Sequence, residues 1–287
     1  MIPILVAALS LEPCAIVHAR TRLPALLVRR GIPAGDVEMG FITYVVPTPA
    51  GLILIDPAVG ALTPEHAEHL PLWVRATLPD FSHSPRAGEV LRGQQVRAVL
   101  VTHTHWDHLS GAWDFPAARV MAPVDDLAWA RRLPADSPHA AAVPWRMLQP
   151  INLDGPPREG FTASRDVLGD GTVIALLLRG HTPGSVGYLV NGRYFFIGDA
   201  AWEMAPGGKA KIAAALADED PSEAARSLEL ILAARRAHPD WVVLPAHDLR
   251  AAAGLPACLF MPGGSSSGGA PRTSDPDARA LRVPPPP

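Results

Sequence analysis

The sequence predicts an α/β fold, because short apolar segments typical of strands alternate with segments of helical spacing. The valine-rich segment Val96–Val101 has the composition of a buried strand. Pro221–Ala237 repeats apolar residues at helical spacing, as in Ala224, Leu228 and Ile231. The chain has 287 residues, of which 48% are hydrophobic and 18% charged, so it can form one large α/β domain or two small ones.

The first part of this pattern contains two strands followed by two helices. Met39–Val46 and Leu52–Asp56 are predicted to be neighbouring strands, because residues 47–51 between them include two prolines and a glycine. Pro64–Leu78 is predicted to be a helix, since its leading proline suits a first helical turn. Gly88–Gln95 is predicted to be a second, shorter helix.

The alternation continues through the middle of the chain to its C-terminal part. Val124–Arg132 is predicted to be a helix. The prolines in Leu133–Gln149 favour a loop or a broken helix, which could lie over a site. Further strands are predicted at Arg119–Ala122, Thr172–Leu178, Val186–Val190, Tyr194–Ile197 and Trp241–Leu244.

Charge and cysteine content narrow the classes of function. The formal net charge is −3 and the sequence pI is about 6.4, with no dense run of lysine or arginine, so nucleic acid is not an expected partner. Cys14 and Cys258 lie near opposite ends of the chain and fit no paired spacing of metal ligands. We therefore expect two free thiols rather than a disulfide.

Side chains that bind metals are concentrated directly after the strand Val96–Val101, at His103, His105, Asp107 and His108. Histidines one residue apart point the same way while the backbone stays extended, and imidazole and carboxylate groups suit zinc and similar divalent ions. Three histidines on a surface loop without a metal are the alternative. The position at the carboxyl end of a strand, where α/β folds place their sites, favours a metal site.

Three later residues have the same relation to a predicted strand. His181 lies in the turn Gly-His-Thr-Pro-Gly, Asp199 follows Gly198, and His247 follows Leu-Pro-Ala. Any one of them alone is more typical of an ordinary turn. Together with the histidine-rich segment they predict one metal centre built from several strand ends.

The whole pattern, from about Met39 to Asp248, resembles the metallo-β-lactamase superfamily. The resemblance implies a four-layer αββα sandwich with the metal site at the edges of the two sheets. It implies that His103, His105 and His181 bind one metal ion, that Asp107, His108 and His247 bind the other, and that Asp199 bridges the two. Two divalent ions are expected, most readily Zn²⁺, with Mn²⁺, Co²⁺ and Fe²⁺ as alternatives.

The same resemblance matches Asp56 to an aspartate that hydrogen-bonds near the ligands without binding metal. Such partners fix the orientation of ligating imidazoles. A plain turn-forming aspartate before Pro57 is the other interpretation.

The activity implied by the resemblance is hydrolysis, in which a hydroxide that bridges the metals attacks a carbonyl or phosphoryl centre. Asp107 would be the catalytic residue, because it would bind metal, orient the nucleophile and pass a proton to the leaving group.

The acyl-homoserine lactonases of this superfamily resemble the chain in length, in the seven-ligand pattern and in the Gly-Asp-Ala context of Asp199. They carry a tyrosine a few residues after the bridging aspartate, where this sequence has Trp202, which is therefore a candidate for substrate contact. Trp106, Trp113 and Trp145 could line an apolar pocket with it, although core packing suits each of them equally well.

We expect a small ester or lactone as the substrate. The alternatives are thioester or phosphodiester hydrolysis, and oxidation of persulfides by a single iron ion. A small molecule is the predicted partner, with no nucleic acid and no membrane, and the oligomeric state is not predicted.

The domain organisation follows from these assignments. Residues 1–38 are expected to be an N-terminal segment belonging to the fold, and residues 39–253 the catalytic domain of metallo-β-lactamase fold. Residues 254–287, rich in glycine, serine and proline, are expected to be a disordered tail. Ile2–Leu11 is expected to be an opening strand or an irregular start, and it is too short to span a bilayer. An export signal is the alternative, although no basic residue precedes the segment. A cytoplasmic location follows as the expectation.

Overall fold

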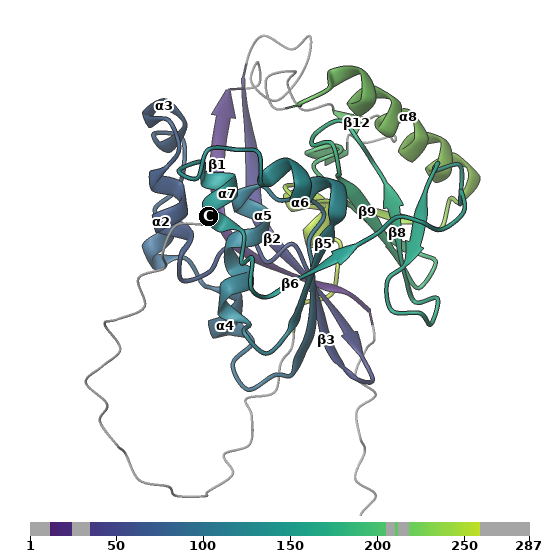
Figure 1. Cartoon of the computed structure of the whole chain (residues 1–287), viewed down its shortest axis with the longest axis horizontal. Helices are drawn as coiled ribbons and strands as arrows, with labels where there is room; N and C mark the ends of the chain where they lie inside the picture. Colours follow the sequence, from purple (N-terminus) through teal and green to yellow (C-terminus); the bar gives the residue numbers. More distant parts are fainter. Residues whose placement is uncertain (1–11, 25–34, 205–209, 212–217, 259–287) are drawn as a thin grey trace, which may run out of the picture.

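Two β-sheets packed face to face form the centre of the molecule, and helices cover the outer face of each (Figure 1). The computed structural model describes residues 12–24, 35–204, 210–211 and 218–258. Helices α2 and α4 lie on one side of the molecule in Figure 1 and α8 on the other. The predicted four-layer αββα sandwich is confirmed.

The first sheet combines an antiparallel half and a parallel half. Among its first three strands each runs antiparallel to its neighbour, and the remaining strands each run parallel to the one before, with helical segments in the crossovers. In spatial order the strands are β1 (Cys14–Pro24), β2 (Asp36–Thr48), β3 (Gly51–Ile55), β4 (Val96–Leu100), β5 (Arg119–Pro123) and β6 (Leu148–Ile151).

The second sheet is antiparallel except at one edge, where its last strand in sequence runs parallel to its neighbour. Its strands in spatial order are β13 (Val242–Pro245), β10 (Tyr194–Gly198), β9 (Val186–Val190), β8 (Val173–Leu177) and β7 (Ser164–Asp166). A separate two-stranded ribbon pairs β11 (Glu203–Met204) with β12 (Ala210–Lys211).

The longest helix, α8 (Pro221–Ala237), has the predicted bounds, and the Asp220 carboxylate caps it by accepting the N–H groups of Ser222 and Glu223. The other helical segments are shorter: α2 (Thr63–Glu68), α3 (Leu72–Arg75), η1 (Phe81–His83), α4 (Ala87–Val90), α5 (Trp106–Leu109), η2 (Ser110–Asp114), α6 (Val124–Ala130), α7 (Pro138–Ala142) and α9 (Leu249–Ala253).

The side chains of β3 alternate between two hydrophobic cores, one on each face of the first sheet. Ile53 and Ile55 point into the core between the sheets, and Leu54 points into the core under the helices. All three are almost fully buried, as expected for a strand covered on both faces. The second sheet is used in the same way, with Leu228 and Ile231 of α8 packed on its outer face.

Hydrogen bonds from buried groups hold the two sheets together. The Tyr44 hydroxyl donates to the Pro245 carbonyl at 2.6 Å, and the Tyr188 hydroxyl donates to the Val101 carbonyl at 2.8 Å. Burial raises the pKa of both phenols, so they remain protonated donors. These bonds join β2 to the end of β13, and β9 to the end of β4.

The predicted strands agree with the observed ones to within one residue, except for Met39–Val46, which β2 extends by three residues at its start and two at its end; two predictions for helices need correction. Pro64–Leu78 is not one helix: it divides into α2 and α3 at Leu70–Pro71, because a proline cannot continue the hydrogen-bond ladder of a helix interior. Gly88–Gln95 contributes only its beginning to α4. Leu133–Gln149, expected as a loop or broken helix, contains α7 and the start of β6.

The structure also describes part of each end of the chain. Residue 38 lies inside β2, and β1 pairs along the length of that strand, so residues 14–24 are part of the first sheet. The predicted strand Ile2–Leu11 lies outside the described residues, as do residues 259–287 of the predicted tail. At its start, however, the tail is ordered: Leu255 packs against the core between the sheets. No helix in the described part of the chain is both long and apolar enough to cross a bilayer.

Cys14 and Cys258 form a disulfide, so the prediction of two free thiols is wrong. The bridge spans 244 residues of sequence, and its Cα atoms are 5.2 Å apart. Helix α9 packs against β1, which brings the residues that follow it to the first strand. Sequence spacing cannot reveal a pair that depends on this approach.

We predict that replacing both cysteines, Cys14→Ala with Cys258→Ala, lowers the free energy of unfolding by about 2–4 kcal/mol, because the bridge restricts the unfolded chain over a long loop. Urea unfolding with and without a thiol reductant measures the loss. Reductant should lower the midpoint of the wild-type protein and leave the double variant unchanged. A wild-type midpoint that stays constant after the bridge has been cleaved contradicts a stabilising role.

Candidate metal centre

The topology gathers four strand ends at one edge of the sandwich. Strands β8, β10 and β13 run in the same direction, so the residues after them, His181, Asp199 and His247, lie at one edge of the second sheet. His103 follows β4 at the facing edge of the first sheet. The Val186 N–H donates to the Thr102 carbonyl at 3.0 Å and joins the two edges beside these residues.

Two glycines in the predicted motifs are required by close packing. Gly198 has φ +52°, and a Cβ there would lie 2.5 Å from Thr102 Oγ1. Gly180 has φ +130°, and a Cβ there would lie 2.0 Å from the backbone nitrogen of Ala224 in α8. Each glycine therefore allows the residue that follows it to approach the site from a strand end.

The first group of candidate ligands consists of His103, His105 and His181. Their ligand nitrogens lie within 4.8 Å of one another. His105 Nδ1 is 2.9 Å from His181 Nε2, and the His103 ring centroid is 4.6 Å from that of His105. Three imidazoles that converge in this way could hold one metal ion.

The second group consists of Asp107, His108 and His247, and its ligand atoms also lie within 4.8 Å of one another. Asp107 Oδ2 is 3.9 Å from His108 Nε2 and 3.6 Å from His247 Nε2. Asp107 and His108 both lie on α5, which begins immediately after His105.

Asp199 lies between the two groups. Its Oδ1 is 3.3 Å from both His108 Nε2 and His247 Nε2, and its Oδ2 is 3.4 Å from His181 Nε2. Asp199 also forms a third group of possible ligands with His103 and His108. One carboxylate oxygen therefore faces each of the two main groups.

Hydrogen bonds outside these groups orient the imidazoles. The Asp56 carboxylate accepts from His108 Nδ1 at 3.0 Å and from the Thr102 N–H and hydroxyl at 2.7 Å each. The His247 Nδ1–H donates to the Gly40 carbonyl at 2.7 Å. Both bonds leave Nε2 directed to the site, as for ligating histidines.

Two further carboxylates support the site but were not identified from the sequence. Asp218 Oδ1 is 3.2 Å from His181 Nδ1. The Asp126 carboxylate is fully buried and accepts the backbone N–H of Thr104, between His103 and His105. Asp126 lies on α6, three residues after β5, and Asp218 precedes α8; neither belongs to a motif that the sequence distinguishes.

Burial and neighbouring charges have opposite effects on the ionisation of the site. Burial lowers the pKa of His103 and of His105 well below the ordinary value. Burial acts to raise the pKa of Asp199, yet His247 and His108 outweigh it and hold this pKa well below the usual range. The first two imidazoles are therefore neutral with a free lone pair, and Asp199 is ionised among groups that can balance its charge.

The residues present fit divalent metal ions. His103 Nε2, His108 Nε2 and Asp199 Oδ1 are buried and have no hydrogen-bond partner among the described residues. Buried polar atoms without a partner are rare, and an unplaced ion is one of the accepted explanations. Imidazole nitrogens and carboxylate oxygens in groups of three suit zinc.

A family model described as the metallo-beta-lactamase superfamily matches residues 35–247. The chain belongs to this superfamily. No curated protein matches it. Solved structures of the same fold include a mutant of AiiA from B. thuringiensis with N-decanoyl-L-homoserine bound at the active site. That chain is 16% identical with a TM-score of 0.66, and the match covers 86% of this chain and 97% of that one.

Two other solved structures illustrate the range of relatives. AidC, described as a dizinc quorum-quenching lactonase, is 14% identical with a TM-score of 0.56, and the match covers 82% of this chain and 86% of that one. AbOPH, described as a hydrolase of the β-lactamase superfamily, is 18% identical with a TM-score of 0.58, with coverage of 87% and 90%. At these sequence identities, the comparison shows that the structures share a fold and no more.

The four tryptophans considered for an apolar pocket have different environments in this superfamily member. Trp106 is buried beside Phe41, Trp113 donates to the Ala142 carbonyl, and Trp145 lies half-exposed beneath a guanidinium. The Trp202 indole N–H donates to Asp199 Oδ2 at 2.6 Å. Among these four, the structure places Trp202 against a candidate ligand.

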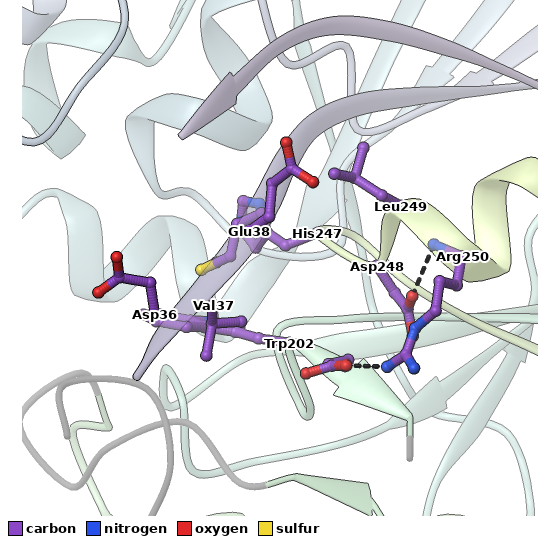
Figure 2. Close-up of a pocket in the computed structure, with 10 residues that line it drawn as sticks. Asp36, Val37, Glu38, Trp202, His247, Asp248, Leu249 and Arg250 are labelled. Carbon is purple, nitrogen blue, oxygen red and sulfur yellow. Dashed lines mark hydrogen bonds and ion pairs between the residues drawn. The ribbon is translucent and has the colours of Figure 1, made fainter. Parts of the chain in front are cut away.

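Trp202 and His247 also line a cavity of about 210 Å³. Figure 2 shows Asp36, Val37 and Glu38 of β2 along one wall and Leu249 and Arg250 of α9 along another, with Trp202 between them. Arg250 is paired with Glu203, and Asp248 caps α9. The cavity therefore combines an apolar surface with a mostly acidic wall.

We predict that Trp202→Phe weakens zinc binding about tenfold, the lower end of the effect of losing a hydrogen bond to a ligand. Phenylalanine keeps the ring contact with Val37 and Met39 but removes the donor to Asp199. Competition with a chromophoric chelator measures affinity, and Trp113→Phe, which removes an indole N–H that donates to a backbone carbonyl and not to a candidate ligand, is the control. Equal affinities in all three proteins would contradict a role for this bond.

Proposed function

We propose that the protein is a binuclear metal-dependent hydrolase that cleaves small esters or lactones. The observation that carries the proposal is the position of Asp199, whose two oxygens face different groups of candidate ligands. A carboxylate so placed can bridge two ions, whereas a mononuclear site needs only one of the groups.

In the proposed enzyme, His103, His105 and His181 would hold one ion, Asp107, His108 and His247 would hold the other, and Asp199 would be shared between them. Zinc is the expected metal because the donors are nitrogen and oxygen in small groups. When bound, two such ions supply positive charge and lower the pKa of water, so that a nucleophile is available near neutral pH.

Asp107 is the proposed catalytic residue. Its side chain is 18% exposed, so a water or a substrate can reach it from solvent. A carboxylate oxygen of Asp107 takes a proton from the attacking water as the water oxygen bonds to the carbonyl carbon. The bond between that carbon and the leaving oxygen then breaks, and Asp107 returns the proton to that oxygen. One water is consumed, and an acid and an alcohol are formed.

The cavity beside Trp202 supports a substrate without negative charge. Val37, Met39 and Trp202 give it an apolar wall, while Asp36 and Glu38 add carboxylates. Like charges disfavour binding, so an anionic substituent would be excluded more than a neutral one of equal size. The N-acyl-homoserine products bound in similar structures support an ester or lactone as the reacting group.

The disulfide bears on where the protein works. Disulfides persist in oxidising compartments and are rare in the cytosol. The bridge between Cys14 and Cys258 therefore argues against the expected cytoplasmic location, and we infer an oxidising compartment.

We predict that Asp107→Ala lowers kcat/KM for the best ester or lactone substrate by at least about 10³-fold, within the range of general acid–base catalysis. Asp154→Ala is the matched control, because Asp154 is an exposed aspartate that pairs with Arg165 at the surface. The screen should include lactones, aryl esters, thioesters and phosphodiesters with zinc, manganese and cobalt. Full turnover by the Asp107 variant would contradict the mechanism.

Metal analysis of the same protein separates hydrolysis from the oxidative alternative. Two zinc ions per chain support the proposal. One iron per chain with oxygen uptake on a persulfide would contradict it.

We predict that the wild-type enzyme prefers a neutral aryl ester over one of equal size that carries a carboxylate. Replacing Asp36→Asn and Glu38→Gln should reduce this preference about twofold for each charge removed, since exposed charge interactions are worth about 0.5 kcal/mol. The ratio of kcat/KM for the two esters is the measurement. Asp166→Asn, outside the cavity, is the control, and a ratio unchanged by the double replacement would place the substrate elsewhere.

A further inference from the structure

One histidine lies against the candidate metal centre without belonging to any group of candidate ligands. His139 lies on α7, in the segment that the sequence left open between a loop and a broken helix. Its ring centroid is 4.2 Å from that of His105, with 33° between the planes, and 5.9 Å from that of Trp129. Helix α7 also packs against α5, which carries Asp107.

The hydrogen bonding of His139 defines which nitrogen carries its proton. The backbone N–H of Trp106 donates to Nδ1 of His139 at 3.3 Å. In a neutral imidazole one nitrogen accepts and the other donates, so the proton is on Nε2. Among the residues that the structure describes, none accepts a hydrogen bond from this Nε2–H. His139 thus offers a donor that the fold does not use.

The exposure of the site indicates where a substrate approaches. Five candidate ligands are at most 6% exposed: His103, His108, His181, Asp199 and His247. By contrast, His105 and Asp107 are partly exposed, and so is His139. The centre is therefore accessible at His105, Asp107 and His139, in addition to the cavity that His247 lines.

We propose that His139 is a catalytic hydrogen-bond donor, whose Nε2–H binds the carbonyl oxygen of the substrate as negative charge develops on it. The proposal rests on the proposed hydrolase function and supplies a protein donor for the oxyanion. No proton is transferred: the imidazole stays neutral, and the hydrogen bond strengthens as the carbonyl carbon becomes tetrahedral. A donor placed in this way stabilises the transition state more than the bound substrate.

Two variants separate the functions of the two ring nitrogens. His139→Asn keeps an acceptor near the position of Nδ1 for the Trp106 N–H but removes the donor at Nε2. His139→Gln places an amide N–H near the position of Nε2 but removes the acceptor. An exposed histidine on η1 gives the control His83→Asn.

We expect His139→Asn to lower kcat by about 10- to 100-fold, near the lower part of the effect of an oxyanion donor. Its zinc content and its KM should stay close to those of wild type. His139→Gln should recover most of the loss. Calorimetric binding of a phosphonate that resembles the tetrahedral intermediate should weaken in His139→Asn by a factor similar to the fall in kcat/KM.

Three results would overturn the proposal. Wild-type kcat and phosphonate affinity in His139→Asn would exclude a donor role. Loss of zinc in both variants would mean that His139 only supports His105. Equal loss in both variants with full zinc content would assign the effect to ring stacking. If the wild-type protein cleaves no ester or lactone, the proposed function fails by itself, and phosphonate binding to the zinc-loaded variants still tests the donor.

Discussion

Thr102 connects the two sheets at the edge where the candidate ligands gather, and the geometry of the site depends on it. Its N–H and hydroxyl donate to the Asp56 carboxylate, and its carbonyl accepts from Val186 of the other sheet. Asp56 adopts φ +51°, an uncommon value for a residue with a side chain, and accepts from His108 at the same time. The contact of Thr102 with Gly198 positions the start of the Asp199 turn. One buried threonine thus couples both groups of ligands.

Hydrogen bonds of this kind also explain why so polar a cluster can lie inside an apolar fold. Burying a polar atom without a partner costs about 1–3 kcal/mol. Here the outward nitrogens of His108, His181 and His247 are bonded to Asp56, Asp218 and a backbone carbonyl. Among the candidate ligands, the buried atoms without a partner are His103 Nε2, His108 Nε2 and Asp199 Oδ1. Metal binding that satisfies them would stabilise the folded chain as well, so folding and metal loading should be thermodynamically linked.

Most of the candidate ligands could be predicted from the sequence because each is a local feature, a histidine or an aspartate directly after an apolar strand. The strand directions then bring these local features to one edge. The Cys14–Cys258 bridge, Asp218 and His139 could not be predicted, because each depends on segments that meet only in the folded chain. The division of residues 64–78 into two helices could have been predicted from the sequence, because Pro71 lies between them.

The sandwich separates the chemistry of the site from its specificity. The groups that can hold metal follow strands or lie on α5, and they are embedded in the hydrogen-bond network around Thr102. The surfaces that a substrate meets come from other elements: α7 with His139, the start of β2, and the residues around Trp202. These elements lie outside the hydrogen bonds around Thr102, although Trp202 also donates to Asp199 and so contacts both parts. A shared fold at 14–18% identity therefore says nothing about the substrate, and in the function that we propose the substrate is selected at Trp202, His139 and the acidic wall of the cavity.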